Sequence, residues 1–330
     1  MPDAPLVIFV VTIVLALTYA YTNGANDAAN AVAAVISTRA MTPFWAVLMG
    51  AGLNLAGALT GTAVAKTIAK GIVEPSQITE YTAMAAILGS VVWVLMATRL
   101  GVPVSVSHSL IASMVGAGLA TAGVDAINGA GLTKVLIALA ASPILGFGVS
   151  FFAVSGIYWL VRRSSPSGVN RLFRFLQILA GGFLAYSHGK NDGQNAMGII
   201  ALAATFYTGR ALDVELWMIL LSSVTIGAGT AIGGLQVIRT LGMRITKLDP
   251  VQGFTSSISG AMLIEAASTI GLPVSTTHTA SGSIMGVGAS RRLSAVRWGV
   301  TRNIAMAWLV TYPVCFVLGY VLSEGLNGVF

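Results

Sequence analysis

A short polar sequence occurs twice in this chain, and both copies lie inside long apolar stretches. The first copy, GANDAANA, covers residues 24–31, and the second, GKNDGQNA, covers residues 189–196. A different pair follows in the same order, with GVPVSVSHS at 101–109 and GLPVSTTHT at 271–279. Because two motifs recur in one order at nearly one offset, the chain is predicted to be two transmembrane repeats, residues 1–162 and 163–330.

The composition identifies the environment of these repeats. Of the 330 residues, 55% are hydrophobic and only 9% are charged, whereas about 25% of residues are charged in soluble domains. The chain is therefore predicted to be an integral membrane protein. Its net charge of +7 is typical of basic cytoplasmic loops and does not indicate nucleic-acid binding. The single cysteine, Cys315, lies in an apolar run and excludes a disulfide framework and a thiolate metal cluster.

Ten apolar segments are spaced along the chain, and a bilayer core needs about 20 apolar residues for each helical span. The predicted fold class is an all-α polytopic membrane protein with five segments in each repeat. They cover residues 6–36, 44–65, 78–98, 101–122 and 135–161 in the first repeat, and 173–204, 214–238, 251–270, 271–288 and 296–322 in the second.

The basic residues of the connections predict the orientation of these segments, because Lys and Arg are retained on the cytoplasmic side. One side carries only Lys66, Lys70, Lys134 and Arg210. The other, cytoplasmic side carries Arg39, Arg162, Arg163, Arg171, Arg174, Arg239, Arg244, Lys247, Arg291, Arg292 and Arg297. This assignment places both termini outside and gives the two repeats opposite topology, provided that each third segment and the motif stretch after it form a re-entrant hairpin. Pro103 and Pro273 provide the helix breaks at the hairpin tips.

Two acidic residues, Asp27 and Asp192, lie within apolar runs, where a carboxylate is costly and usually functional. Each is accompanied by two amides, Asn26 and Asn30 in the first copy and Asn191 and Asn195 in the second. Carboxylate and amide oxygens are hard ligands that suit a small cation, and a carboxylate also takes a proton. These residues are therefore the predicted site of a coupling ion, either a proton or a cation such as sodium at the two Asp residues.

The proline motifs contribute donors of the opposite kind. Hydroxyls follow each proline, at Ser105 and Ser107 in the first repeat and at Ser275, Thr276 and Thr277 in the second. Hydroxyls and free backbone amides at a helix N-terminus bind anions, although the same side chains also serve as N-caps. A cation between the two carboxylates would remove their repulsion toward an oxyanion, so that cation and anion strengthen each other's binding.

The four motifs together resemble the signature of the inorganic phosphate transporter (PiT) family, over essentially the whole chain. The resemblance implies an inverted-repeat symporter in a prokaryotic inner membrane, often homodimeric, that imports phosphate by alternating access with sodium or protons and needs no other cofactor. It implies cation and phosphate ligation by Asp27, Asn30, Asp192 and Asn195. It adds Ser105, Ser107, Ser275, Thr276 and Thr277 around the phosphate.

Several polar residues break the repeat or need separate interpretation. Lys190 and Gln194 replace Ala25 and Ala29 of the first copy, and His188 stands opposite Asn23, outside the repeated motif. The remaining candidates for a proton site or a gate are His108, His278, Glu265 and Lys190. Each of these residues also has an alternative interpretation. The two histidines could be structural hydrogen-bond partners, and Glu265 could face a cytoplasmic vestibule. Lys190 could extend its ammonium group to the membrane interface.

Three other functions are alternatives to phosphate symport. A sulfate permease of the same family would use the same donors, because sulfate has the same tetrahedral shape. A divalent-cation transporter would use the Asp and Asn residues alone and leave the hydroxyls unexplained. A hydrolase is excluded, since Ser107 and His108 are adjacent, so they do not face each other on a helix, and no acid orients the histidine.

Overall fold

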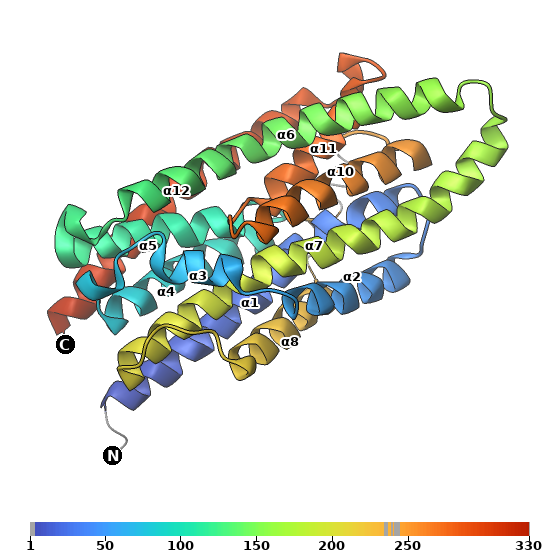
Figure 1. Cartoon of the computed structure of the whole chain (residues 1–330). Coiled ribbons are helices and arrows are strands. Elements are labelled where there is room, and N and C mark those ends of the chain that lie inside the picture. The colour runs from blue at the N-terminus through green and yellow to red at the C-terminus, as the bar shows by residue number, and fades with distance from the viewer. Residues whose placement is uncertain (1–3, 234–236, 239, 241–244, 330) are drawn as a thin grey trace.

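The computed structural model describes residues 4–233, 237, 238, 240 and 245–329, which form helices joined by short connections (Figure 1). Their one isolated β-bridge joins Val73 to Ile127. Arg239 and Arg244 lie outside the described residues. The first-repeat elements are α1 (Ala4–Ser37), α2 (Pro43–Ala58), α3 (Ala63–Lys70), η1 (Pro75–Gln77), α4 (Glu80–Leu100), α5 (Val106–Ala122), η2 (Gly123–Ala126) and α6 (Gly129–Val161). The second-repeat elements are α7 (Pro166–Thr208), α8 (Leu216–Ile232), α10 (Pro250–Thr269), α11 (Thr276–Ala289), η4 (Leu293–Ala295) and α12 (Trp298–Val329).

Five of the described helices are long and apolar enough to cross a membrane, and the bent pair α2 and α3 raises the number to six. The five are α1, α4, α5 with η2, α6 and α12. Helix α7, which carries the polar second motif, has 43 residues and is the longest described. The prediction of an all-helical membrane protein with several apolar spans is confirmed.

The predicted segment 44–65 is wrong as one continuous helix. Helix α2 ends at Ala58, and α3 begins at Ala63 after a bend of 70°. The backbone amides of Val64 and Ala65 donate to Gln194 Oε1 at 2.8 and 3.1 Å. A side chain of α7 thus satisfies amides that the new helix start leaves free, which stabilises the bend. The predicted segment 214–238 is also shorter than expected, because α8 ends at Ile232.

Both proline motifs break a helix, as predicted. Helix α4 ends at Leu100 and α5 begins at Val106, while α10 ends at Thr269 and α11 begins at Thr276. Gly101 and Gly271 adopt φ values of 68° and 72°, a left-handed conformation in which glycine has no steric penalty. The sequence motif therefore supplies both the proline that prevents a continuous helix and the glycine that allows the turn.

Helices of one repeat pack against helices of the other. Helix α5 packs on α12, α11 on α6, α1 on α8, and α2 on α7. Glycines bring these backbones close together: a Cβ on Gly116 would lie 2.1 Å from the carbonyl oxygen of Phe316, and one on Gly282 would lie 2.4 Å from that of Pro143. The repeats are interlocked, so a site between them receives side chains from both.

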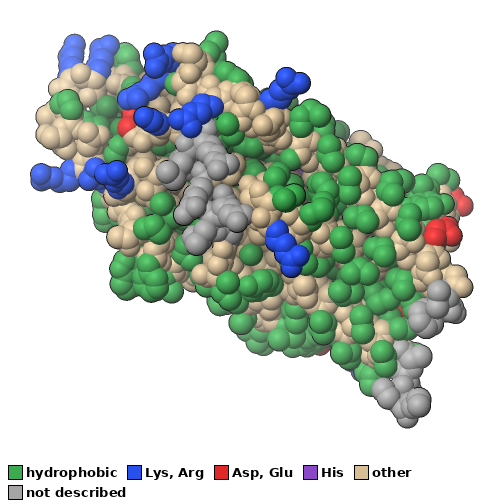
Figure 2. Space-filling model, turned by 180° about the vertical axis from the view of Figure 1, so that it is seen from behind, with side chains coloured by type: hydrophobic (Ala, Val, Ile, Leu, Met, Phe, Trp, Pro, Cys, Tyr) green, Lys and Arg blue, Asp and Glu red, His purple; other side chains and the backbone are tan. Residues whose placement is uncertain are grey.

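Charge is separated along the molecule. The described ends of the chain lie at one end, and the turn between α6 and α7 lies at the other (Figure 1). Figure 2 shows most of the visible Lys and Arg side chains gathered at one end and the visible Asp and Glu side chains mostly toward the other, with a largely uncharged surface between. Such a belt is what a bilayer requires of the surface it covers.

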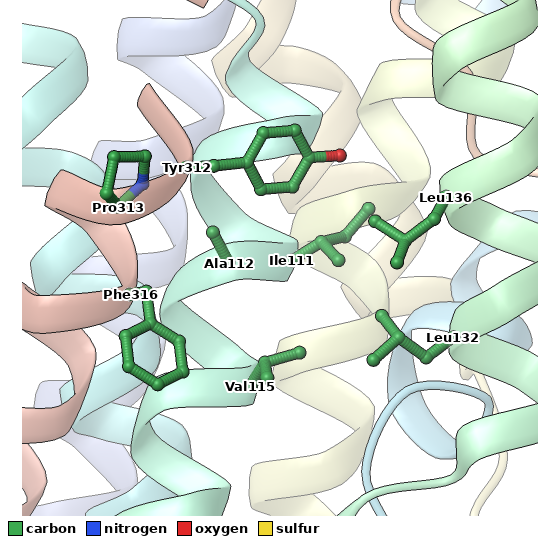
Figure 3. A pocket seen from close by; sticks show the side chains of 8 residues that line it. All are labelled: Ile111, Ala112, Val115, Leu132, Leu136, Tyr312, Pro313 and Phe316. Carbon is green, nitrogen blue, oxygen red and sulfur yellow. The ribbon is translucent and has the colours of Figure 1, made fainter. Parts of the chain in front are cut away.

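An apolar cavity of about 380 Å³ lies beside this bundle, between α5, α6 and α12 (Figure 3). It is lined by Ile111 and Val115 of α5, Leu132 and Leu136 of α6, and Pro313 and Phe316 of α12. Because its lining carries almost no polar groups, it offers no site for an ion.

Candidate functional site

The two motif aspartates meet in the interior of the molecule. Asp27 lies in the middle of α1 and Asp192 in the middle of α7, and the side chains are 1% and 2% exposed. The hydroxyl of Thr276, at the start of α11, is 3.4 Å from Asp27 Oδ2 and 3.1 Å from Asp192 Oδ2. The structure therefore brings together the two predicted carboxylates, which are 165 residues apart in the chain.

A histidine outside the repeated motif, His188, lies between these carboxylates. His188 Nε2 is 3.6 Å from Asp27 Oδ2 and 3.4 Å from Asp192 Oδ2. With its amide oriented to satisfy the hydrogen bonds, Asn23 donates to the same two oxygens at 3.2 and 3.3 Å. His188 and Asn23 each precede an aspartate by four residues, which is one helical turn. That spacing was the available signal, and it was missed because the two residue types differ.

The other ring nitrogen of His188 has a fixed partner. His188 Nδ1 is 2.9 Å from Asn54 Oδ1, while Asn54 Nδ2 donates to Thr230 at 2.6 Å. Because the amide oxygen only accepts, Nδ1 carries the proton. Nε2, which has no hydrogen-bond partner among the described residues, is then left facing the two carboxylates. Three ligand atoms, one from each of Asp27, His188 and Asp192, lie within 4.8 Å of one another. This arrangement is suited to a cation or a proton.

The second asparagine of each motif donates a hydrogen bond to a hydroxyl of the opposite repeat. Asn30 donates to the hydroxyl of Thr277 at 3.2 Å, and Asn195 donates to that of Ser107 at 3.1 Å. The Oδ1 atoms of both asparagines are buried and have no partner among the described residues. Unpaired amide oxygens are suitable additional ligands for a hard cation.

The first asparagine of each motif, Asn26 or Asn191, contacts the helix breaks instead. Asn26 donates to Thr98 at 2.9 Å, and Asn191 donates to Ser268 at 2.9 Å. Asn191 also accepts from the backbone amide of Val274 at 3.3 Å. These two side chains bond to the broken ends of α4 and α10, and the hydrogen bonds of the described residues join neither of them to the carboxylates.

The hydroxyls of the hairpins divide into two groups. Ser105 and Ser275 are N-caps, accepting from the backbone amides of His108 at 3.2 Å and His278 at 3.1 Å. Thr277 instead lies 2.7 Å from Asp27 Oδ1 and 3.1 Å from the carbonyl oxygen of Val104. With Thr276, it connects the start of α11 directly to the carboxylates.

The two motif histidines lie against each other and against α12. The rings of His108 and His278 are 4.5 Å apart, and that of His278 is 3.8 Å from Trp308. They line a separate, largely apolar cavity of about 590 Å³. Neither histidine belongs to the group of ligand atoms around Asp27.

The two remaining candidates form an ion pair with each other. Lys190 Nζ contacts Glu265 Oε1, and both side chains are partly exposed. Lys190 thus has a carboxylate partner on α10, which the sequence could not indicate because the pair is 75 residues apart.

The chain is similar to known proteins over nearly its whole length. The model of the Phosphate transporter family matches residues 23–319. A probable low-affinity inorganic phosphate transporter of Rhizobium meliloti is 41% identical, over 93% of this chain and 92% of the relative. One of Bacillus subtilis is 38% identical, over 99% and 100%. A solved structure described as the sodium-dependent phosphate transporter is 28% identical with a TM-score of 0.91, covering 98% of this chain and 100% of the other.

Proposed function

This chain belongs to the phosphate transporter family, and we propose that it imports inorganic phosphate across a membrane together with a coupling cation. One observation carries the coupling: the hydroxyls at the start of α11, from Thr276 and Thr277, contact the carboxylates of Asp27 and Asp192. Donors suited to an oxyanion and acceptors suited to a cation thus share one buried site.

The coupling follows from competition for these hydroxyls. Without a cation, the carboxylates of Asp27 and Asp192 hold the hydroxyls of Thr276 and Thr277 and repel an anion. A cation bound to the carboxylates offsets part of their negative charge and leaves the hydroxyls free to donate to phosphate. By linkage, bound phosphate strengthens cation binding by the same factor. Moving one negative charge into a cell costs about 2.3 kcal/mol per 100 mV, which the cation gradient offsets.

The phosphate donors in this proposal come from both repeats. Ser107 at the start of α5 and Thr276 and Thr277 at the start of α11 provide hydroxyls, and the amides of Asn30 and Asn195 lie beside them. The N-terminal ends of α5 and α11 add backbone amides and the positive ends of two helix dipoles. Ser105 and Ser275 support these helix ends as caps.

Sodium is the cation that we propose for the carboxylate site. The oxygens of Asp27 and Asp192 and the unpaired Oδ1 atoms of Asn30 and Asn195 are all hard ligands. The related structure is described as sodium-dependent, which supports the same ion here. A proton is the second candidate, because His188 Nε2 faces both carboxylates and has no hydrogen-bond partner among the described residues.

We also propose that the repeats have opposite topology, with both termini outside and two re-entrant hairpins formed by α4–α5 and α10–α11. The chain ends lie together at one end of the molecule, and the visible basic side chains gather at one end (Figures 1 and 2). The exchanged packing of α5 on α12 and α11 on α6 supports two equivalent units divided in the turn between α6 and α7. Alternating access would move these units relative to each other around the carboxylates.

Uptake by the purified protein in liposomes tests this function. Labelled phosphate should accumulate under an inward sodium gradient, and excess sulfate should not compete. Accumulation driven by a pH gradient and indifferent to sodium would assign the proton. Uptake suppressed by sulfate would reassign the substrate, and absence of uptake under both gradients would contradict the proposed symport.

A further inference from the structure

A second charged site lies at the far end of α11 from the carboxylates. Its cavity has a volume of about 360 Å³ and is lined by the basic side chains Lys247, Arg291, Arg292 and Arg297. The carboxylates contact Thr276 at the start of α11, whereas the cavity lies beyond its end at Ala289. Fourteen helical residues span about 20 Å, so the two sites are distinct.

The basic groups of this cavity are only partly neutralised. Asp249 forms an ion pair with Arg291 at 3.0 Å and accepts a hydrogen bond from Tyr158 at 2.6 Å. In the described part of the chain, neither Lys247 nor Arg292 is paired with a carboxylate. Four basic side chains from two chain segments therefore line this cavity, and Asp249, the carboxylate beside them, is already engaged by Arg291 and Tyr158.

The surrounding backbone favours an anion as well. Gln252, in the first turn of α10, and Arg297, directly before α12, both line the cavity. The N-terminal ends of these two helices therefore border it, and each contributes partial positive charge. Leu293 and Trp298, which are neighbours in sequence of the lining residues, are 67% and 48% exposed, as apolar residues are at a membrane interface.

The first repeat shows that this charge is not a consequence of the fold. Its corresponding connections contain η1 and η2, with Glu74, Glu80 and Asp125 in place of the basic cluster. Retention of Lys and Arg on the cytoplasmic side explains basic loops at this end. It does not explain why they converge on one cavity with buried polar side chains, Thr246 and Gln252, in its lining.

We propose that this cavity binds a phosphate group, supplied either by the headgroup of an anionic phospholipid or by free inorganic phosphate. Arg side chains and a Lys ammonium match the charge and the acceptor oxygens of phosphate. Basic pockets between transmembrane helices hold lipid headgroups in the same way. This site does not depend on the proposed transport function.

The test compares two double variants of the full chain, purified in neutral detergent. Lys247→Gln with Arg292→Gln removes two cavity charges, and Arg162→Gln with Arg163→Gln removes two charges from the turn between α6 and α7. Dioctanoyl phosphatidate and inorganic phosphate are titrated separately, and the thermal midpoint is followed. The cavity variant should weaken the apparent affinity for one of the two ligands about thirtyfold, whereas the control pair should not.

The ligand that binds more weakly to the cavity variant shows where the bound phosphate group comes from. Loss for phosphatidate alone assigns a lipid headgroup, and loss for inorganic phosphate alone assigns the free anion. Equal affinities in the wild type and the cavity variant for both ligands would overturn the proposal, as would an equal loss in the control pair. If the cavity variant does not purify as folded protein, the single variant Lys247→Gln decides by the same criterion.

Discussion

The indole Nε1 of Trp308 donates a hydrogen bond to the carbonyl oxygen of Pro103 at 3.1 Å. Pro103 lies in the break between α4 and α5, where the helix no longer supplies a partner for this carbonyl. The same indole lies 3.8 Å from the ring of His278, near the start of α11. One side chain of α12 therefore contacts both hairpin tips and positions them relative to each other.

Substituting Trp308→Phe should slow phosphate uptake about tenfold while changing KM little. Phenylalanine keeps the ring beside His278 but leaves the buried carbonyl of Pro103 unpaired, at a cost of about 1–3 kcal/mol. The measurement is the dependence of uptake rate on phosphate concentration in liposomes.

The matched control for this variant is Trp93→Phe. Trp93 Nε1 also donates a hydrogen bond to α12, to the hydroxyl of Thr311 at 3.0 Å. Neither Trp93 nor Thr311 lies in a hairpin tip. Comparable slowing in both variants would assign Trp308 a purely structural role.

Substituting Asp192→Asn should strongly reduce cation-driven phosphate uptake while leaving the protein folded. Asparagine is nearly isosteric but removes one of the two negative charges that attract the coupling cation. A coupling free energy of 1–3 kcal/mol corresponds to a loss of about 5–150-fold. Uptake under a sodium gradient is the measurement, with Asp213→Asn as an exposed control outside the site. Wild-type uptake with unchanged cation dependence would refute the assigned role.

Substituting Thr277→Val should raise KM for phosphate about tenfold, because it removes a hydroxyl that donates to a charged group. Thr277→Ser restores the hydroxyl and should return KM to near the wild-type value. The cation concentration for half-maximal uptake should rise together with KM in the valine variant, since the two sites are linked. An unchanged KM in the valine variant would show that phosphate does not use this hydroxyl.

Substituting Gly57→Ala should lower the thermal midpoint, because the new Cβ would lie 1.9 Å from the carbonyl oxygen of Tyr186. Forcing α2 away from α7 at this contact costs about 1–3 kcal/mol. Gly52→Ala, on the same helix, meets no atom within 4 Å and should keep or raise the midpoint. Equal midpoints for the two variants would contradict the close packing of α2 on α7.

Some elements of the fold could be predicted because their causes are local in the chain. Pro103 and Pro273 interrupt helices wherever they stand, and Gly101 and Gly271 permit the turns beside them. The bend between α2 and α3 could not be predicted, because its cause is the side chain of Gln194 about 130 residues away. In the sequence alone, Gln194 is only a departure from the repeat.

The candidate site could also be predicted only in part. Duplication of the motifs predicted that Asp27 and Asp192 are functional partners, and the structure places them around one hydroxyl. His188 was set aside because its counterpart is Asn23, yet both residues contact the same two carboxylates. Residue identity differed between the repeats, whereas the position one turn before the aspartate was shared.

The sequence by itself determined the membrane environment, the internal duplication, the helix breaks and the residues that carry charge into the interior, since these depend on hydropathy and on local backbone chemistry. Only the tertiary structure decided the partners: that Asn30 reaches Thr277, that Asn26 instead holds the break after α4, and that Lys190 pairs with Glu265. A hydrogen bond or an ion pair depends on the distance between atoms in space, and packing between the interlocked repeats sets that distance.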